Sequence, residues 1–443
     1  MNWPKLLSSH RLGQKQDAHD QSRSAFEQDY DRIIFSHPFR RLQDKTQVHP
    51  LPVEDFVHTR LTHSLEVSSV GRSLGKKVGE QILKRHPELN QKYSLFDFGA
   101  IIAAASLAHD LGNPPFGHAG EDAISDFFLQ HPKGQSLKPF VSESEWADLT
   151  QFEGNAQGFR LLNQKQYGLK LTAATLGAFT KYPCPAFFPD RDKSKKSQKK
   201  FGYFESEKEI FENVAGQLSL IKINEQSWNR HPLAFLVEAA DDICYGIIDL
   251  EDGCRLGLVS IDEAVELMAA ILKEQFNREK VNKIVGITEK LGVLRAMTIN
   301  KLIDECAALF LGQEQNILDG KFDRSLTDSI PSKDSLKTIS KISIEKIYRA
   351  RTVVEIEASG HAVLPGLLEE FVTTGQSLQG LKASRKYENL QLMLPEEIRW
   401  ELLQRPENTY SMLRLIVDFV SGLTDRHALS LYAKVKGFSF SFS

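Results

Sequence analysis

Two histidines and two aspartates in this sequence have side chains that could together bind a divalent metal ion. His109 and Asp110 are adjacent where the apolar segment 101–108 ends and a turn rich in glycine and proline begins. His63 lies near the start of an amphipathic segment, where an imidazole on the apolar stripe is costly to bury unless it is hydrogen-bonded or ligated. Asp241 lies in a further apolar segment. Taken singly, each of these residues is more typical of a hydrogen-bonded structural group than of a metal site.

Together the four residues offer two imidazole nitrogens and two carboxylate oxygens. This mixed donor set suits Mn²⁺, Fe²⁺, Co²⁺ or Zn²⁺, and Mg²⁺ less well, and the absence of a cysteine ligand argues against a structural zinc site. An ion with only four protein ligands keeps positions for water and for a phosphate oxygen, so it can lower the pKa of the water and polarise the phosphate. The set therefore indicates a metal-dependent hydrolase.

Asp241 is followed by Tyr245 and Asp249 at intervals of four residues, which places the three side chains on one face of a helix. An adjoining face is apolar and would be core: Leu236, Ala240, Ile243 and Ile247. One helix would thus offer a metal ligand, an aromatic wall and a second polar group in line. The alternative is that Tyr245 is an ordinary core residue.

The elements that must position these residues are predicted to be helices packed around one another, an all-α fold. Apolar residues at spacings of four or five predict a helix running to about residue 84: Leu61, Leu65, Val70, Leu74, Val78 and Ile82. Further helices are predicted over 98–110, 120–130, 153–163, 207–220, 232–250, 262–275, 293–311, 363–373, 395–403 and 409–421, with a last one after residue 424. Residues 190–200 and 317–340 are predicted to be loops. Because no aromatic residue lies between the lysines of the first loop, we expect a solvated segment rather than a nucleic-acid patch.

The composition is that of an ordinary globular protein, with 41% hydrophobic and 26% charged residues in 443. The formal net charge of -3 gives no general attraction to nucleic acid or membrane, so an anionic substrate would have to be met by local positive charge and metal. The four cysteines form no CxxC pair and are expected to be reduced core residues. No apolar stretch approaches the roughly 20 residues needed to cross a bilayer, and we expect a cytoplasmic protein.

The order of His63, His109-Asp110 and Asp241 resembles the signature of the HD superfamily. The segments 39–48, 60–67, 109–121, 152–157, 238–243 and 420–432 resemble those of the bacterial deoxyguanosine triphosphate triphosphohydrolases, so the resemblance extends over nearly the whole chain. It implies an all-α HD-domain helical fold with additional C-terminal helices. We expect an HD phosphohydrolase core over 1–260 and a helical part over 261–443, packed on the core or continuous with it.

The resemblance also implies roles for individual residues. His63, His109, Asp110 and Asp241 would be the metal ligands, and His118 would deliver a proton that Glu121 orients. The implied substrate contacts are Arg60 at the α-phosphate, Tyr245 and Asp249 at the deoxyribose and its 3′-hydroxyl, and Gln47 at the sugar or base. Asp242 stands where a mammalian relative has a lysine, so Arg295, Lys181 and Lys200 are candidates for neutralising the triphosphate. His118 as a helix cap, and Arg60 as a residue outside the substrate site, are the structural alternatives.

The activity implied is metal-dependent hydrolysis of deoxynucleoside triphosphates to deoxynucleoside and inorganic triphosphate by attack at the α-phosphorus. The metal would be Mn, Mg, Co, Fe or Zn, and dGTP is the best single guess for the substrate. Family members are often homo-oligomers, either tetramers or hexamers, and are often activated by a nucleotide effector. We expect no membrane partner, and nucleic-acid binding is not indicated. Two alternatives remain: an HD nucleotidase or phosphodiesterase acting on monophosphates or cyclic nucleotides, and a non-catalytic nucleotide-sensing module, which would need a broken ligand set.

Overall fold

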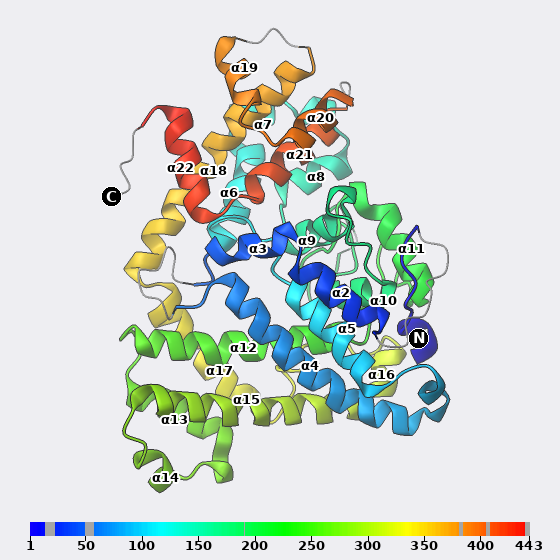
Figure 1. Ribbon diagram of the computed structural model, residues 1–443, viewed down its shortest axis with the longest axis vertical. Helices are drawn as coiled ribbons and strands as arrows, with labels where there is room; N and C mark the ends of the chain where they lie inside the picture. The colour runs from blue at the N-terminus through cyan, green and yellow to red at the C-terminus, as the bar shows by residue number, and fades with distance from the viewer. Residues whose placement is uncertain (14–22, 49–56, 190, 381–383, 405–407, 439–443) are drawn as a thin grey trace.

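The computed structural model describes residues 1–13, 23–48, 57–189, 191–380, 384–404 and 408–438. Figure 1 shows that helices cross and pack on one another throughout the molecule. Over these residues the only β-structure is a set of isolated bridges, such as the one between Thr46 and Thr59. The prediction of an all-α fold is confirmed.

The first of two hydrophobic cores contains the helices that carry the predicted metal ligands. Its helices are α1 (Trp3–Leu6), α2 (Ala25–Ile34), α4 (Arg60–Arg85), α5 (Leu95–Ala108), α10 (Ala173–Phe179), α11 (Lys208–Leu218), α12 (Ala234–Arg255), α13 (Ile261–Leu272), α15 (Ile287–Gly312) and α17 (Lys333–Ile342). α4 begins after Thr59, whose hydroxyl oxygen accepts a hydrogen bond from the Thr62 N–H. α5 is buried along almost its whole length, because nearly all of its side chains are apolar.

The second core joins helices from the middle of the chain to helices near its end. It is formed by α6 (Gly117–Gln130), α8 (Glu143–Thr150), α18 (Arg351–Leu378), α20 (Glu396–Gln404), α21 (Thr409–Ser421) and α22 (Asp425–Lys436). α9 (Gly154–Asn163) contributes to both cores. Shorter helices complete the fold: α3 (His37–Arg41), α7 (Pro132–Gln135), α14 (Arg278–Asn282), α16 (Glu314–Leu318) and α19 (Arg385–Gln391).

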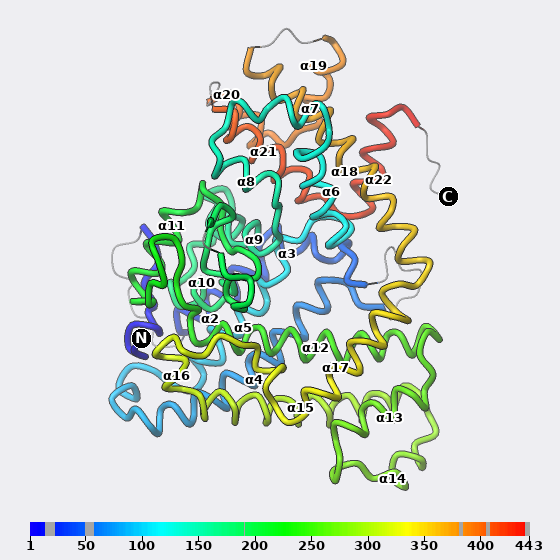
Figure 2. The backbone as a smooth tube through the Cα atoms, turned by 180° about the vertical axis from the view of Figure 1, so that it is seen from behind, coloured from blue at the N-terminus to red at the C-terminus, as the bar shows by residue number. Residues whose placement is uncertain are grey.

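The helices beyond residue 260 are shared between the two cores. In Figures 1 and 2, α13, α14 and α15 lie at one end of the molecule with α12, whereas α19, α20 and α21 lie at the other end near α7 and α8. The core around α6 and α18 therefore crosses the predicted boundary between 1–260 and 261–443. The division into an HD core and a helical C-terminal part at that boundary stays a prediction.

The structure corrects two predicted boundaries. The segment 317–340, predicted to be a loop, contains most of α17, and the helix predicted over 363–373 is only the middle of α18. α17 buries Ile339 alone among its side chains, and the first turns of α18 are largely exposed. The apolar residues of α17, Leu336, Ile339 and Ile342, do recur at helical spacing, but the run is short and lies among polar residues. In the first turns of α18, charged and polar residues likewise interrupt the apolar ones. Asp190 lies outside the described residues. The only helical element within 191–200 is a 3₁₀ turn, Lys196–Gln198.

No helix in the described part of the chain is both long enough and apolar enough to span a membrane.

Glycines in α4 allow that helix to approach α5 closely. A Cβ atom added to Gly75 would lie 2.7 Å from the backbone oxygen of Phe98 and 2.9 Å from the Cα of Gly99. These are backbone atoms, so the two helices would have to separate. The close packing of α4 on α5, which places His63 near His109, therefore requires glycine at position 75.

We predict that Gly75→Ala destabilises the protein by about 1–3 kcal/mol, because overpacking this contact displaces α5. The measurement is the free energy of unfolding in denaturant. The matched control is Gly292→Ala in α15, where a Cβ would meet nothing within 4 Å, so the change should be neutral or stabilising by up to about 1 kcal/mol. Equal stabilities of the two variants would contradict the packing argument.

Candidate active site

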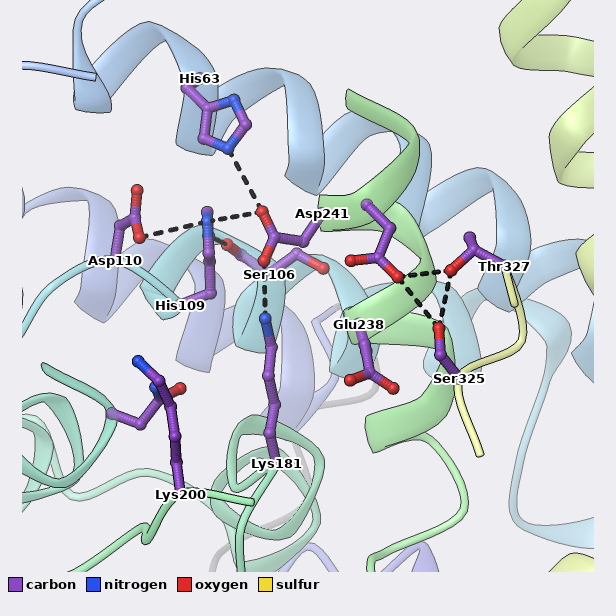
Figure 3. Close-up of polar contacts among 12 residues, drawn as sticks. His63, Ser106, His109, Asp110, Lys181, Lys200, Glu238, Asp241, Ser325 and Thr327 are labelled. Carbon is purple, nitrogen blue, oxygen red and sulfur yellow. Dashed lines mark hydrogen bonds and ion pairs between the residues drawn. The ribbon is translucent and has the colours of Figure 1, made fainter. Parts of the chain in front are cut away.

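Three helices bring the predicted metal ligands to one place. His63 lies in the first turn of α4, His109 and Asp110 directly follow the last residue of α5, and Asp241 lies in the middle of α12. Figure 3 shows the side chains of His63, His109 and Asp110 gathered around Asp241. α4 packs on both α5 and α12, so residues far apart in the sequence become neighbours.

The ligand atoms of His63, His109 and Asp110 lie close enough to share one ion, and Asp241 lies beside both imidazoles. The Nε2 atoms of His63 and His109 each lie 3.3 Å from Oδ1 of Asp241, and His109 Nε2 lies 3.5 Å from Oδ1 of Asp110. One ligand atom from each of His63, His109 and Asp110 fits within 4.8 Å of the others. These three side chains are buried, whereas Asp241 is partly open to a cavity.

The ring of His109 is oriented for metal binding. Its Nδ1 lies 2.7 Å from the backbone oxygen of Ser106, so Nδ1 carries the proton and Nε2 has its lone pair free. Nε2 is buried and has no hydrogen-bond partner among the described residues, although carboxylate oxygens lie near it. A buried imidazole nitrogen directed at two carboxylates fits a divalent cation, which can act as the missing partner. The donor set of this structure therefore fits the metal that the sequence predicts.

Positive side chains stabilise the two carboxylates. Arg60 donates to Oδ2 of Asp110 over 2.8 Å, and Lys181 donates to Oδ2 of Asp241 over 2.6 Å. Burial by itself would raise the pKa of Asp110, but the electrostatic interactions with the neighbouring His109 and Arg60 side chains outweigh it and lower the pKa. Lys181 and His109 likewise outweigh burial and hold the pKa of Asp241 well below its usual range. Both groups are carboxylates at neutral pH, the form that binds metal.

The His118 and Glu121 side chains form a hydrogen-bonded pair at the start of α6. His118 Nδ1 lies 2.7 Å from Oε2 of Glu121, and the His118 side chain is 82% exposed. Glu121 is buried, and its Oε1 accepts the Gly154 N–H over 2.6 Å. The N-cap position of α6 belongs to Phe116, so His118 does not cap the helix. The hydrogen bond to Glu121 raises the pKa of His118.

A cavity of about 440 Å³ connects these groups. This volume lies in the range of small-molecule binding sites. The four predicted metal ligands line it together with five further residues predicted to act in the site or in phosphate neutralisation: Gln47, Arg60, Tyr245, Lys181 and Lys200. His118 and Glu121 line it as well, and α18 adds Val353, Ile356 and Glu357. Most of the predicted site is thus assembled around one space.

Two predicted substrate-binding residues are placed differently. Arg295 donates to Oε2 of Glu251 over 2.7 Å and is not among the residues that line the cavity. Asp249 is buried and accepts a hydrogen bond from the Tyr348 hydroxyl over 2.9 Å, beside a smaller pocket that Gln47 also lines. Burial raises the pKa of Asp249 to about 8. In this structure, the Tyr348 hydroxyl therefore occupies one of the two carboxyl oxygens of Asp249, Oδ2.

Sequence reasoning missed Tyr348. Its ring lies 5.3 Å from that of Tyr245, centroid to centroid, and the two rings form one wall of the cavity. Tyr348 ends the π-helical turn Ser343–Tyr348, directly before α18. No motif in the sequence identifies it, since its contact with α12 depends on how a distant segment packs. The π-helical turn, a form enriched at functional sites, is recognisable only in the structure.

Lys200 lies near the His118 and Glu121 pair. Its Nζ atom donates to Oε1 of Glu153 over 3.0 Å and lies 3.9 Å from Oε2 of Glu121. The lysine therefore places a positive charge beside the carboxylate that orients His118. Lys181 and Lys200 flank the cavity from the segment between α10 and α11, which the sequence marks only as a loop rich in proline and lysine.

Comparisons with known proteins agree with this arrangement. Residues 60–145 match the HD domain, and residues 330–434 match the phosphohydrolase-associated domain. The chain is 43% identical to a deoxyguanosinetriphosphate triphosphohydrolase-like protein of Synechocystis sp. over 99% of this chain and 100% of the relative. This chain belongs to the deoxyguanosinetriphosphate triphosphohydrolase-like family of HD hydrolases.

Other members of the family are also similar over most of their length. A protein of the same name from Pseudomonas aeruginosa is 38% identical over 99% of each chain. A deoxyguanosinetriphosphate triphosphohydrolase of Klebsiella pneumoniae is 31% identical over 93% of each chain. The family resemblance inferred from the sequence motifs is confirmed, and the matched HD domain contains His63, His109 and Asp110.

We predict that the protein binds one divalent transition metal ion per chain and that Asp110→Ala loses the ion together with hydrolytic activity. The reason is that one of two carboxylate donors disappears while Arg60 is left unpaired. Metal content is measured by mass spectrometry of the purified protein. The matched control is Asp242→Asn, because the Asp242 carboxylate accepts from Ser325 and Thr327 instead. Normal metal content in Asp110→Ala would refute this assignment.

A second prediction concerns pH. The Glu121 carboxylate raises the pKa of His118, so the protonated imidazole persists to higher pH than in water. If this form donates a proton, kcat/KM falls as pH rises through that pKa. Glu121→Gln lowers the pKa, and the alkaline limb of the kcat/KM profile should therefore move to lower pH. The profile is measured at fixed metal concentration, with metal content as the control. An alkaline limb at the wild-type position would exclude His118 as the titrating acid.

Proposed function

We propose that this chain hydrolyses deoxynucleoside triphosphates to deoxynucleoside and inorganic triphosphate, with dGTP as the best single substrate. The observation that carries the proposal is one cavity lined by the two-histidine, two-aspartate donor set, by His118 with Glu121, and by Tyr245. The names of the relatives support the substrate class. The cavity volume suits a nucleotide.

His63, His109, Asp110 and Asp241 would hold the divalent ion, which would supply Lewis acidity toward a phosphate oxygen and lower the pKa of water. Arg60 stands beside this set, with a guanidinium nitrogen 2.8 Å from Asp110. Its remaining donors can bind an oxygen of the α-phosphate. The protein thus binds the reacting phosphate from the side of α4.

His118 would act on the leaving group. Water adds to the α-phosphorus and loses a proton to solvent as the bond from phosphorus to the 5′-oxygen breaks, and that oxygen takes a proton as the deoxynucleoside departs. Protonated His118 can supply it, and Glu121 holds the ring through Nδ1, which leaves Nε2 to face the substrate. Inorganic triphosphate leaves with the oxygen of the water.

The charge of the triphosphate would be met by lysines. Lys181 and Lys200 line the cavity and come from one segment, whereas Arg295 pairs with Glu251 outside it. We therefore assign neutralisation of the β- and γ-phosphates to the two lysines. Each is already paired with a carboxylate, so binding of the polyphosphate exchanges ion-pair partners rather than burying free charges.

The sugar would be recognised by the aromatic wall. Tyr245 packs against Tyr348, and an aromatic ring against C2′ leaves no room for a 2′-hydroxyl. Tyr348 bonds only Oδ2 of Asp249, so Oδ1 could still accept a hydrogen bond from the 3′-hydroxyl. Asp249 does not line the cavity, however, whereas Tyr348 does, so sugar binding through Asp249 would require a movement of Tyr348.

The experiment that tests the proposal is incubation of the metal-supplemented protein with each deoxynucleotide and ribonucleotide, alone and in mixtures. Chromatography then quantifies deoxynucleoside, inorganic triphosphate and orthophosphate. Mixtures are needed because an activating nucleotide can differ from the substrate. Stoichiometric deoxynucleoside and triphosphate support the proposal. Orthophosphate from a monophosphate, or opening of a cyclic nucleotide without triphosphate release, would instead identify a nucleotidase or phosphodiesterase.

We predict that kcat/KM for dGTP exceeds that for GTP by a factor of about 10² or more, because a 2′-hydroxyl would clash or be buried without a partner. Tyr245→Ala should reduce this ratio while metal content stays normal. Tyr245→Phe is the matched control, because it keeps the ring and should keep the selectivity. Comparable kcat/KM values for GTP and dGTP in the unmodified protein, with any activating nucleotide present, would contradict this role of α12.

A further inference from the structure

A buried carboxylate from the phosphohydrolase-associated domain is bonded to two segments of the candidate active site. Asp425 is the first residue of α22, and its side chain is fully buried. Its Oδ1 accepts the Phe116 N–H over 3.1 Å, and its Oδ2 accepts both the N–H and the hydroxyl of Thr46, the former over 3.1 Å. One carboxylate therefore joins segments separated from it by more than three hundred residues.

The first of these segments holds His118. Phe116 has a φ of 65°, a left-handed conformation that is strained for a bulky residue and persists only where the surroundings impose it. Phe116 directly precedes Gly117, the first residue of α6, so its conformation sets the direction in which the helix starts and where His118 lies. The hydrogen bond from its N–H to Asp425 acts on this strained position.

α18 supports the same turn. A Cβ atom at Gly360 would lie 3.0 Å from a ring carbon of Phe116, so the ring is in direct contact with the helix backbone. The backbone N–H of Phe116 is thus held by α22 and its ring by α18, two helices of the matched phosphohydrolase-associated domain.

The second segment leads to Gln47, which lines the cavity. Thr46 precedes Gln47 and is bonded to Asp425. The adjacent Lys45 is buried, and its Nζ atom donates to the backbone oxygens of Asn113, over 2.5 Å, and Ser421, over 2.9 Å. The end of α21 is thereby bonded through Lys45 to the turn that follows Asp110.

Asp425 itself does not line the cavity, and in the described part of the chain no cation lies within ion-pair distance of it, although the buried Lys45 nearby interacts with it electrostatically. Its acceptor atoms are instead used by N–H and O–H donors of the two active-site segments. A buried carboxylate is costly unless such donors satisfy it, so the charge is stable only while both segments hold their places.

We propose that Asp425 is a positioning residue for His118: it fixes the strained Phe116 turn, and through that turn the phosphohydrolase-associated domain completes the catalytic arrangement of the HD domain. This inference rests on the proposed function, in which His118 delivers a proton to the leaving group. It assigns to residues 330–434 a direct part in turnover, beyond packing on the remainder of the chain.

The test is a double-mutant cycle with Asp425→Ala and His118→Ala in the full-length, metal-loaded protein. If Asp425 acts through His118, Asp425→Ala should lower kcat roughly tenfold to a hundredfold, because a misplacement of about 1 Å at a reacting group has effects of this size. Metal content should be unchanged, and the double variant should be no slower than His118→Ala alone. Wild-type kcat in Asp425→Ala, or losses that multiply in the double variant, would overturn the proposal.

Asp148→Ala is the matched control for a merely structural effect. Asp148 is also a buried aspartate, and it accepts from the Tyr410 hydroxyl of α21, over 2.5 Å, and from the Glu205 N–H, over 2.7 Å. It touches neither active-site segment, so its loss should lower the melting temperature and leave kcat at wild type below that temperature. If Asp425→Ala does not fold, Asp425→Val replaces it in the cycle, because its branched side chain fills more of the buried space and, like alanine, accepts a hydrogen bond from neither Phe116 nor Thr46. An equal fall of kcat in the Asp148 variant would overturn the proposal.

Hydrogen exchange separates this inference from the proposed function. In Asp425→Ala the amide of Phe116 loses its acceptor, so exchange in a peptide covering residues 112–121 should become faster than in the wild type and in Asp148→Ala. Unchanged exchange would overturn the positioning role whatever the activity. Faster exchange in a protein that hydrolyses no nucleotide would mean that Asp425 holds the turn and that the proposed function has failed.

Discussion

The burial of two carboxylates beside two imidazoles is the constraint on which the rest of this structure depends. A charge removed from water destabilises a protein strongly unless it is paired. Asp110 is paired with Arg60 from the start of α4, and Asp241 with Lys181 from the segment after α10. Each pair joins elements distant in the sequence. If α4, α5, α12 or the segment after α10 moved by itself, a charge would be left without its partner.

The cavity lies where the two hydrophobic cores meet. α4 and α12 of the first core contribute Arg60 and Tyr245 to its lining, and α6 and α18 of the second core contribute His118 and Val353. This division has a physical logic, because a boundary between cores can leave space for a ligand, which close packing within a core cannot. It also makes the site depend on the helices near the end of the chain.

The electrostatics of the cavity differ from those of a simple basic pocket. Its cations are each paired with a carboxylate: Arg60 with Asp110, Lys181 with Asp241 and Lys200 with Glu153. With a net charge of -3 the whole chain offers no general attraction to an anion either. Binding of a polyphosphate would therefore rely on the added charge of a metal ion and on rearranged ion pairs, which favours a ligand of one geometry over anions in general.

The all-helical fold and most of the candidate site follow from the sequence alone, because helical periodicity is local and because the motifs around His63, His109 and Asp241 are long. The extents of α17 and α18 do not, since the apolar residues in their exposed turns are few and lie among polar ones. Only the tertiary structure pairs Arg295 with Glu251, and only it places Tyr348, 99 residues further along the chain, on Asp249. The position of a side chain on a helix follows from the residues near it in the sequence. The residue that it contacts depends on how helices distant in the sequence pack together, and no local sequence pattern specifies that packing.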